Sequence, residues 1–198
     1  YFRDSIIMHK RIFGLSGVAR SGKDTFGLHL SSILNSDYRQ QSKFVSFAQA
    51  LKQDIDLFLK DKLGISAFTQ DDTEKKLIRP MLVAYGMTMR MRDPNYWIKK
   101  VDTKIKKILN EDYSVIITDV RFPNEINFVN TFTKSTTLHI SRKLPSGKIL
   151  LPPNKEEAEN DPLCKSSCDV SICWPTFSED HEAGYTYTKN VFKTFLTD

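Results

Sequence analysis

The 198-residue sequence lacks any apolar run long enough to span a bilayer, and its first ten residues lack the apolar core of a secretory signal. It also lacks a stretch in which basic and aromatic residues alternate, as they do on many single-strand-binding surfaces. These absences argue against membrane-spanning, exported and nucleic-acid-binding proteins. We therefore expect a cytoplasmic protein that binds neither a membrane nor nucleic acid.

Cysteine is scarce, and all three cysteines (Cys164, Cys168 and Cys173) lie in the last fifth of the chain. Their spacings of four and five residues, with no second pair nearby, do not fit the usual zinc patterns. His181 is the candidate for a fourth ligand. We expect reduced thiols rather than a metal site.

The composition is that of an ordinary globular protein, with 40% hydrophobic and 27% charged residues. The length suits one well-packed domain. A net charge of +5 suits an enzyme that binds small polyanions. We expect an N-terminal extension over residues 1–10 and a single domain over residues 11–198.

The stretch 12–25 predicts a phosphate-binding loop. An apolar run predicts a short buried strand, a loop with Gly17 and Gly22 follows, and Lys23 precedes a helical pattern. This order is typical of a P-loop, in which backbone N–H groups, a helix N-terminus and a lysine surround phosphates. We expect nucleotide contacts from the whole loop: Gly17, Ala19, Arg20, Ser21, Gly22, Lys23, Asp24 and Thr25.

The pattern leaves the Mg²⁺ ligands open, because Asp24 stands where the common P-loop has a metal-binding hydroxyl. The contact could come from Thr25, from Asp24, or from a water held by Asp24. A second candidate is Asp119, which ends the β-branched run 113–119. An apolar strand ending in aspartate often follows a P-loop and holds Mg²⁺, although a turn or capping role is the alternative.

Strand and helix patterns alternate along the chain, which predicts an α/β fold with a parallel sheet flanked by helices. Besides 12–15 and 113–119, strand patterns cover 44–48, 136–140 and 169–173. Helical patterns cover 51–59, 74–92, 96–108 and 188–196. Pro80 should mark a helix start or a kink rather than a helix interior.

Several cations could bind a second phosphoryl group. Arg79 and Arg90 are eleven residues apart, close to three helical turns, so both could point the same way. Lys52 lies just beyond a strand-to-helix junction, although a solvated helix lysine is equally compatible with its position. Arg142 opens a polar segment, about 142–165, that is either a lid closing over phosphates or an ordinary surface loop.

Together these stretches resemble the bacteriophage-type deoxynucleoside monophosphate kinases, within the P-loop nucleotide kinase superfamily. The matching stretches occur in the family's order: 15–25, Phe47-Ala48-x-x-Leu51-Lys52, Arg79-x6-Gly86, Tyr96-Trp97-x-Lys99 and 118–125. The resemblance implies a kinase fold of the nucleoside monophosphate kinase type, with acceptor-binding helices over about 48–110. It implies ATP and Mg²⁺ as donor and cofactor, a deoxynucleoside monophosphate as acceptor, and allows a homodimer.

The resemblance also implies roles for individual residues. The catalytic candidates are Lys23, Asp119 and Arg121. The acceptor-binding candidates are Lys52, Arg79, Arg90, Trp97, Glu125 and Arg142. The metal candidates remain Asp24, Thr25 and Asp119.

Two alternatives stay open. Phosphomevalonate kinases of the animal type share a Ser-Gly-Lys-Asp loop and an Asp-x-Arg element, although Arg121-Phe122-Pro123-Asn124-Glu125 looks more like the nucleotide kinases. A non-catalytic P-loop protein would bind nucleotide without transfer, and the acceptor-side cations argue against it. The stretch 157–161 departs from the nucleotide-kinase pattern, which puts the preferred base in doubt.

Overall fold

The computed structural model describes residues 10–177 and 180–195. It divides into two compact units. The sheet unit combines Tyr1–Phe44 with Lys106–Asp198, and the helical unit is Val45–Ile105. Of the predicted extension over residues 1–10, all but Lys10 lies outside the described residues. Within the described ranges, no helix is both long and apolar enough to cross a membrane.

Strands and helices alternate along most of the chain. The elements are β1 (Ile12–Ser16), α1 (Lys23–Tyr38), β2 (Ser42–Val45), α2 (Phe47–Leu63), α3 (Asp72–Arg92), α4 (Tyr96–Asn110), β3 (Ser114–Val120), α5 (Pro123–Asn130), β4 (Ser135–Lys143), α6 (Lys155–Ser167), β5 (Val170–Pro175) and α7 (His181–Thr194).

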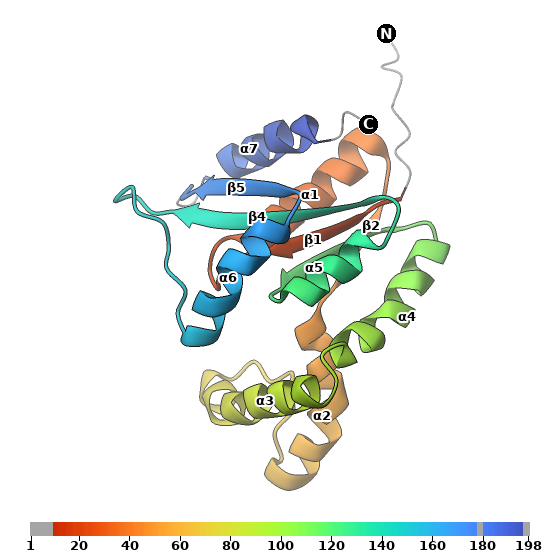
Figure 1. Cartoon of the computed structure of the whole chain (residues 1–198), viewed down its shortest axis with the longest axis vertical. Helices are drawn as coiled ribbons and strands as arrows, with labels where there is room; N and C mark the ends of the chain where they lie inside the picture. The colour runs from red at the N-terminus through yellow and green to blue at the C-terminus, as the bar shows by residue number, and fades with distance from the viewer. Residues whose placement is uncertain (1–9, 178–179, 196–198) are drawn as a thin grey trace. The chain divides into compact units, whose positions relative to one another are not determined.

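The strands form one parallel sheet in the order β2-β3-β1-β4-β5. The central strand β1 pairs with β3 on one side and with β4 on the other. Helices α1 and α7 lie on one face of this sheet, and α5 and α6 lie on the other (Figure 1). Because all strands run the same way, their carboxyl ends meet at one edge, where β1 enters the loop before α1. The predicted α/β fold is confirmed.

The face under α1 and α7 is apolar. Phe13 and Leu15 alternate along β1 with residues that face the other way, as the two-residue period of a strand requires. They belong to a buried cluster of apolar side chains from the sheet and both helices. Its other members are Phe26, Leu30, Ile33, Leu34, Ile116, Leu138, Ile140, Ile172, Trp174 and Phe192. Burial of this cluster contributes hydrophobic stabilisation to the sheet unit.

The face under α5 and α6 carries hydrogen-bonded polar groups. The buried His139 on β4 has its Nε2 2.9 Å from Asp161 Oδ1 on α6. The Asp169 carboxylate accepts from the amide and hydroxyl of Thr137 at 2.7 and 2.8 Å. These bonds satisfy polar groups that would be costly to bury alone. The bond between His139 and Asp161 also ties α6 to the middle of β4.

The helical unit has its own small core, formed by Ile55, Leu59, Ile65, Ala67 and Ile78.

A single carboxylate joins the three helices of the helical unit. Asp54 Oδ2 accepts from the hydroxyls of Tyr85 and Tyr96 at 2.8 and 2.7 Å. Asp54 Oδ1 accepts from Lys100 Nζ at 2.6 Å. Burial, together with the bond to Asp54, raises the pKa of the Tyr85 hydroxyl. The carboxylate therefore cross-links α2, α3 and α4.

Several predicted element boundaries are wrong. The strand expected at 44–48 is Ser42–Val45, because Phe47 already begins α2 and Ser46 caps it by accepting from the Gln49 amide. The last helix begins at His181 instead of 188. Pro80 lies inside α3. Because proline has no N–H, one carbonyl of the preceding turn lacks its helical partner. Pro80 is on the exposed side of the helix, so water can bind that carbonyl. Helix α6 was not predicted, since its sequence shows no apolar stripe and contains Pro162.

Candidate active site

The loop between β1 and α1 has the backbone of a phosphate cradle. Gly17 adopts φ +134°, and a Cβ there would lie 2.2 Å from the Ile140 carbonyl oxygen, so no side chain fits. Gly22 caps α1 with φ +99° and has no side chain to accept from the first amides of the helix. These amides, with the positive end of the helix dipole, can be offered to an anion.

Two further features of the loop suit a ligand. Ser21 is fully buried, and its hydroxyl finds no hydrogen-bond partner in the described part of the chain. Arg20 has the left-handed backbone angle φ +65°, which is strained for a residue with a side chain. Arg142 stabilises this conformation, because its guanidinium donates to the Arg20 carbonyl at 3.2 Å. Arg142 also donates to Thr176 Oγ1 at 3.3 Å.

Lys23 is folded back onto its own loop. Its Nζ donates to the carbonyls of Gly17 and Val18, each at 2.7 Å. Burial, and after it the nearby charge of Arg121, lower the pKa of Lys23 to about 8. The carboxylates of Asp24, Glu157 and Asp119 act in the opposite direction. The site therefore gathers two cations and three carboxylates around one phosphate-binding loop.

The loop after β3 presents Arg121. Glu125, the third residue of α5, is buried, and its Oε2 accepts from the amides of Arg121 and Phe122 at 2.8 and 3.2 Å. This carboxylate holds the backbone of the loop in the manner of a capping box. Glu125 was predicted to bind the acceptor, and the structure places it under the loop as a support for Arg121.

Glu157 on α6 also belongs to the site. The sequence analysis named only its stretch, 157–161, and gave this residue no role. Its Oε2 accepts from the Ala19 amide at 2.7 Å, and its Oε1 lies 3.1 Å from Arg121 Nη1. The pattern Asn154-x-x-Glu157 is a helix-start signal, and Asn154 does cap α6 by accepting from the Glu157 amide. That signal could have located the helix. It could not have shown that the carboxylate meets a loop 138 residues away.

The predicted metal ligands are compatible with Mg²⁺. Asp24 and Thr25 are exposed in the first turn of α1, and the Asp119 carboxylate is close enough to raise the pKa of Lys23. Among the described residues, no three side chains of the metal-ligating kind form a complete cluster. Mg²⁺ in kinases usually takes only one or two carboxylates, because phosphate oxygens and waters complete its shell. The residues present fit such a partial site.

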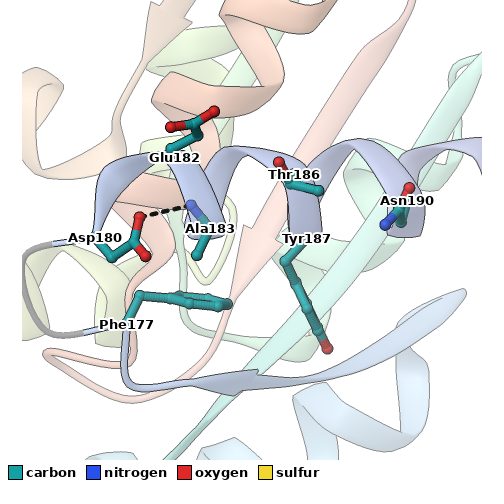
Figure 2. Close-up of a pocket in the computed structure, with 7 residues that line it drawn as sticks. All are labelled: Phe177, Asp180, Glu182, Ala183, Thr186, Tyr187 and Asn190. Carbon is teal, nitrogen blue, oxygen red and sulfur yellow. Dashed lines mark hydrogen bonds between the residues drawn. The ribbon is translucent and has the colours of Figure 1, made fainter.

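A second hollow lies beside the amino-terminal half of α7 (Figure 2). This open groove of about 430 Å³ is lined by Phe177, Asp180, Glu182, Ala183, Thr186, Tyr187 and Asn190. Its aromatic rings contact Trp174, whose own ring would lie 2.9 Å from a Cβ at Gly22. One aromatic layer thus separates the groove from the start of α1. The two carboxylates make the groove unsuitable for a phosphate chain.

The remaining predicted acceptor contacts belong to the helical unit. Lys52 Nζ lies 5.8 Å from the centre of the Phe68 ring, and Arg90 donates to the Pro94 carbonyl at 3.4 Å. Arg79 is exposed on α3. Trp97 is buried, and its Nε1 donates to the Gly86 carbonyl at 3.1 Å. Their described contacts are within that unit, whereas Lys23, Asp119, Arg121, Glu125 and Arg142 come together in the sheet unit.

Comparisons with solved structures identify the fold. Dephospho-CoA kinase from Campylobacter jejuni is similar with a TM-score of 0.52 at 10% identity, over 93% of this chain and 98% of that chain. A sugar kinase from Janibacter sp. HTCC2649 gives a TM-score of 0.46 at 9% identity, over 93% and 95%. Chaetomium thermophilum Kti12 in complex with ADP-AlF3 gives 0.43 at 13% identity, over 92% and 97%. The first comparison shows a P-loop kinase fold.

Sequence comparisons identify the family. No curated protein matches the chain. A family model described as phosphomevalonate kinase matches residues 15–135, a range that includes the P-loop, the helical unit and the loop with Arg121. Together with the fold, this match supports phosphotransfer of the kinase type. Because the match spans more than half of the sequence, the chain belongs to the phosphomevalonate kinase family.

Proposed function

We propose that this protein transfers the γ-phosphoryl group of ATP to the phosphate of a phosphomonoester, which yields a diphosphate and ADP. The observation that carries the proposal is a second cation at the P-loop. Arg121 lies 3.1 Å from Glu157, which also contacts the Ala19 amide of the loop, and the charge of Arg121 lowers the pKa of Lys23. A protein that only binds nucleotide needs no second cation there. A transferred phosphoryl group does, because negative charge must be stabilised on its oxygens during transfer.

In this proposal the residues of the sheet unit have separate roles. Lys23 binds the β- and γ-phosphates, and Arg121 stabilises the charge of the phosphoryl group in transit. Glu125 keeps Arg121 in place through the loop backbone. Asp24, Thr25 and Asp119 are the candidate protein ligands of Mg²⁺, which would neutralise phosphate charge when bound. The reaction needs positioning and electrostatics more than an acid or base.

We propose a deoxynucleoside monophosphate as the acceptor, on the strength of the sequence elements that include 118–125. Lys52, Arg79 and Arg90 are the candidate acceptor contacts in the helical unit. The buried Trp97 would act by positioning α3 and α4. Mevalonate 5-phosphate is the second candidate, and the family match over 15–135 favours it. Both acceptors are phosphomonoesters, so the same cations could serve either.

A coupled assay of ADP release separates these acceptors. ATP and Mg²⁺ would be supplied with each deoxy- and ribonucleoside monophosphate in turn, and with mevalonate 5-phosphate in parallel. Release with deoxynucleotides alone would support the first acceptor, and release with mevalonate 5-phosphate alone would replace it by the second. Bound ATP without release in any reaction would reject the transfer function and favour a non-catalytic nucleotide-binding protein.

A further inference from the structure

The Glu157 carboxylate lies where an anionic ligand of the P-loop would be expected. It accepts from the Ala19 amide at 2.7 Å and pairs with the Arg121 guanidinium at 3.1 Å. A backbone amide of the loop and an arginine are the donors that a phosphoryl group would use. We propose that Glu157 is an internal competitor of the nucleotide, which must displace its carboxylate from these donors in order to bind. This inference rests on the proposed nucleotide-binding function.

The Glu157 carboxylate and a phosphoryl group can use the same two donors. A carboxylate and a phosphoryl group both offer negatively charged oxygens, and each can accept from an amide and a guanidinium at once. Lys23 is meanwhile turned toward the carbonyls of Gly17 and Val18. The Ala19 amide, Lys23 and Arg121 therefore already have internal partners. An incoming phosphate that takes over Ala19 and Arg121 would bring its charge against Glu157, so the two anions exclude each other.

The surroundings of Glu157 allow the side chain to leave while the helix stays. The Glu157 side chain is only 10% exposed, but it belongs to the first turn of α6. The later turns of α6 are anchored by the bond between Asp161 and His139 and by the buried Cys164. Asn154, one step before the helix, offers Nδ2 at 3.4 Å from Glu157 Oε1 and could retain the released carboxylate. Displacement thus requires a rotamer change rather than the loss of α6.

The decisive measurement is the affinity for ADP without Mg²⁺, by isothermal titration calorimetry of the full chain. Glu157→Gln removes the charge, and Glu157→Ala removes both oxygens. The apparent affinity for ADP is reduced in proportion to the molecules in which the Glu157 carboxylate occupies the Ala19 amide and Arg121. We therefore expect the Kd for ADP to fall about tenfold in Glu157→Ala and by less in Glu157→Gln. Glu159→Gln, an exposed carboxylate on the same helix, should leave Kd unchanged.

The outcomes separate this inference from the proposed function. Wild-type binding with equal or weaker binding by both Glu157 variants would overturn the competitor and leave the nucleotide site intact. If neither the wild type nor any variant binds ADP, the nucleotide-binding function and the inference both fail. Weak wild-type binding that becomes strong in Glu157→Ala would support both.

A second measurement uses the wild-type protein and so does not depend on the folding of a variant. Hydrogen exchange followed by mass spectrometry should show slower exchange in the P-loop after ADP is added. The first turn of α6 should exchange faster, because its link to Ala19 and Arg121 is broken. Slower exchange in both segments would mean that Glu157 stays in place and closes over the ligand, which would overturn the inference.

Discussion

The two faces of the sheet differ in how polar their buried groups are. The face under α1 and α7 is filled by apolar side chains from strands and helices. The face under α5 and α6 also buries apolar side chains, among them Ile126 and Val129 of α5, but it adds hydrogen bonds such as the one between His139 and Asp161. Apolar burial stabilises without regard to direction, whereas hydrogen bonds fix a helix at one position. Helix α6 on this second face brings Glu157 to the P-loop. Both faces should therefore contribute to stability, and the geometry of the site should depend more on the second.

The largest effect is expected at the edge shared by both faces. Lys23→Ala should lower kcat by about 10³-fold, because the charge that stabilises the transferred phosphates is lost. The melting temperature should change little, since the cost of burying a desolvated cation offsets the two hydrogen bonds to the Gly17 and Val18 carbonyls that are lost with it. Steady-state kinetics and thermal unfolding would test both statements, with the exposed Lys62→Ala as the control. Near-normal turnover would reject the P-loop assignment.

A substitution on the face under α1 and α7 should lower stability and leave activity unchanged. Phe192 on α7 is fully buried and contacts the rings of Phe13 and Tyr38. Phe192→Ala should lower the free energy of unfolding by about 3–5 kcal/mol, through lost burial and the cavity left behind. Denaturant unfolding would measure the loss, and activity per folded molecule should persist. A variant that keeps its stability but loses activity would contradict the division between the faces.

Arg121→Ala should affect transfer more than binding. We expect kcat to fall about 10²-fold and the Kd for ATP to rise by less, because the bound phosphate loses one donor whereas the transition state also loses the charge that Arg121 is proposed to supply. Arg92→Ala, which removes an exposed arginine of α3, is the matched control. Single-turnover rates and equilibrium binding would be compared for the two variants. An unchanged transfer rate would assign Arg121 a structural role only.

The hydrogen bond between α6 and β4 should have a milder effect. Asp161→Ala leaves the buried His139 without its carboxylate partner, which should cost about 1–3 kcal/mol of unfolding free energy. Glu159→Ala on the same helix is exposed and should stay within about 0.5 kcal/mol of the wild type. Denaturant unfolding of both variants would test this. A loss as large as that of Phe192→Ala would show that this hydrogen bond stabilises the protein as much as the apolar contacts of Phe192.

The smallest effect concerns pH. The native pKa of Lys23 is about 8, below its ordinary value of 10.5, so the folded protein loses this proton first. Affinity for ADP should fall about tenfold per pH unit above about pH 8, because the phosphates prefer the charged lysine. The contribution of Lys23 to folding stability should rise over the same range, since the unfolded chain then binds more protons. In Lys23→Met the affinity should be weak and should lack this titration.

The sequence was informative where local rules decide the structure. The glycines and lysine of 17–23 and the β-branched run ending near Asp119 were sufficient to place the P-loop and the strand that accompanies it. The α/β class followed from the alternation of patterns. Helix α6 was not found, because its contacts are polar and its apolar periodicity is weak. The contact of Glu157 with Ala19 depends on tertiary packing, and no local pattern encodes it.

The order of the strands also sets when the site can exist. Lys23, Arg121 and Glu157 come from three segments separated by about a hundred and then by a few tens of residues, and the chain between β1 and β3 includes the whole helical unit. Pairings between such distant segments close large loops and form slowly. During synthesis the phosphate-binding loop emerges early, but Arg142, which donates to the Arg20 carbonyl, and the Glu157 carboxylate arrive much later. Early folding intermediates should therefore lack the contacts that hold this loop, and phosphate binding is expected only after β4 and α6 have packed.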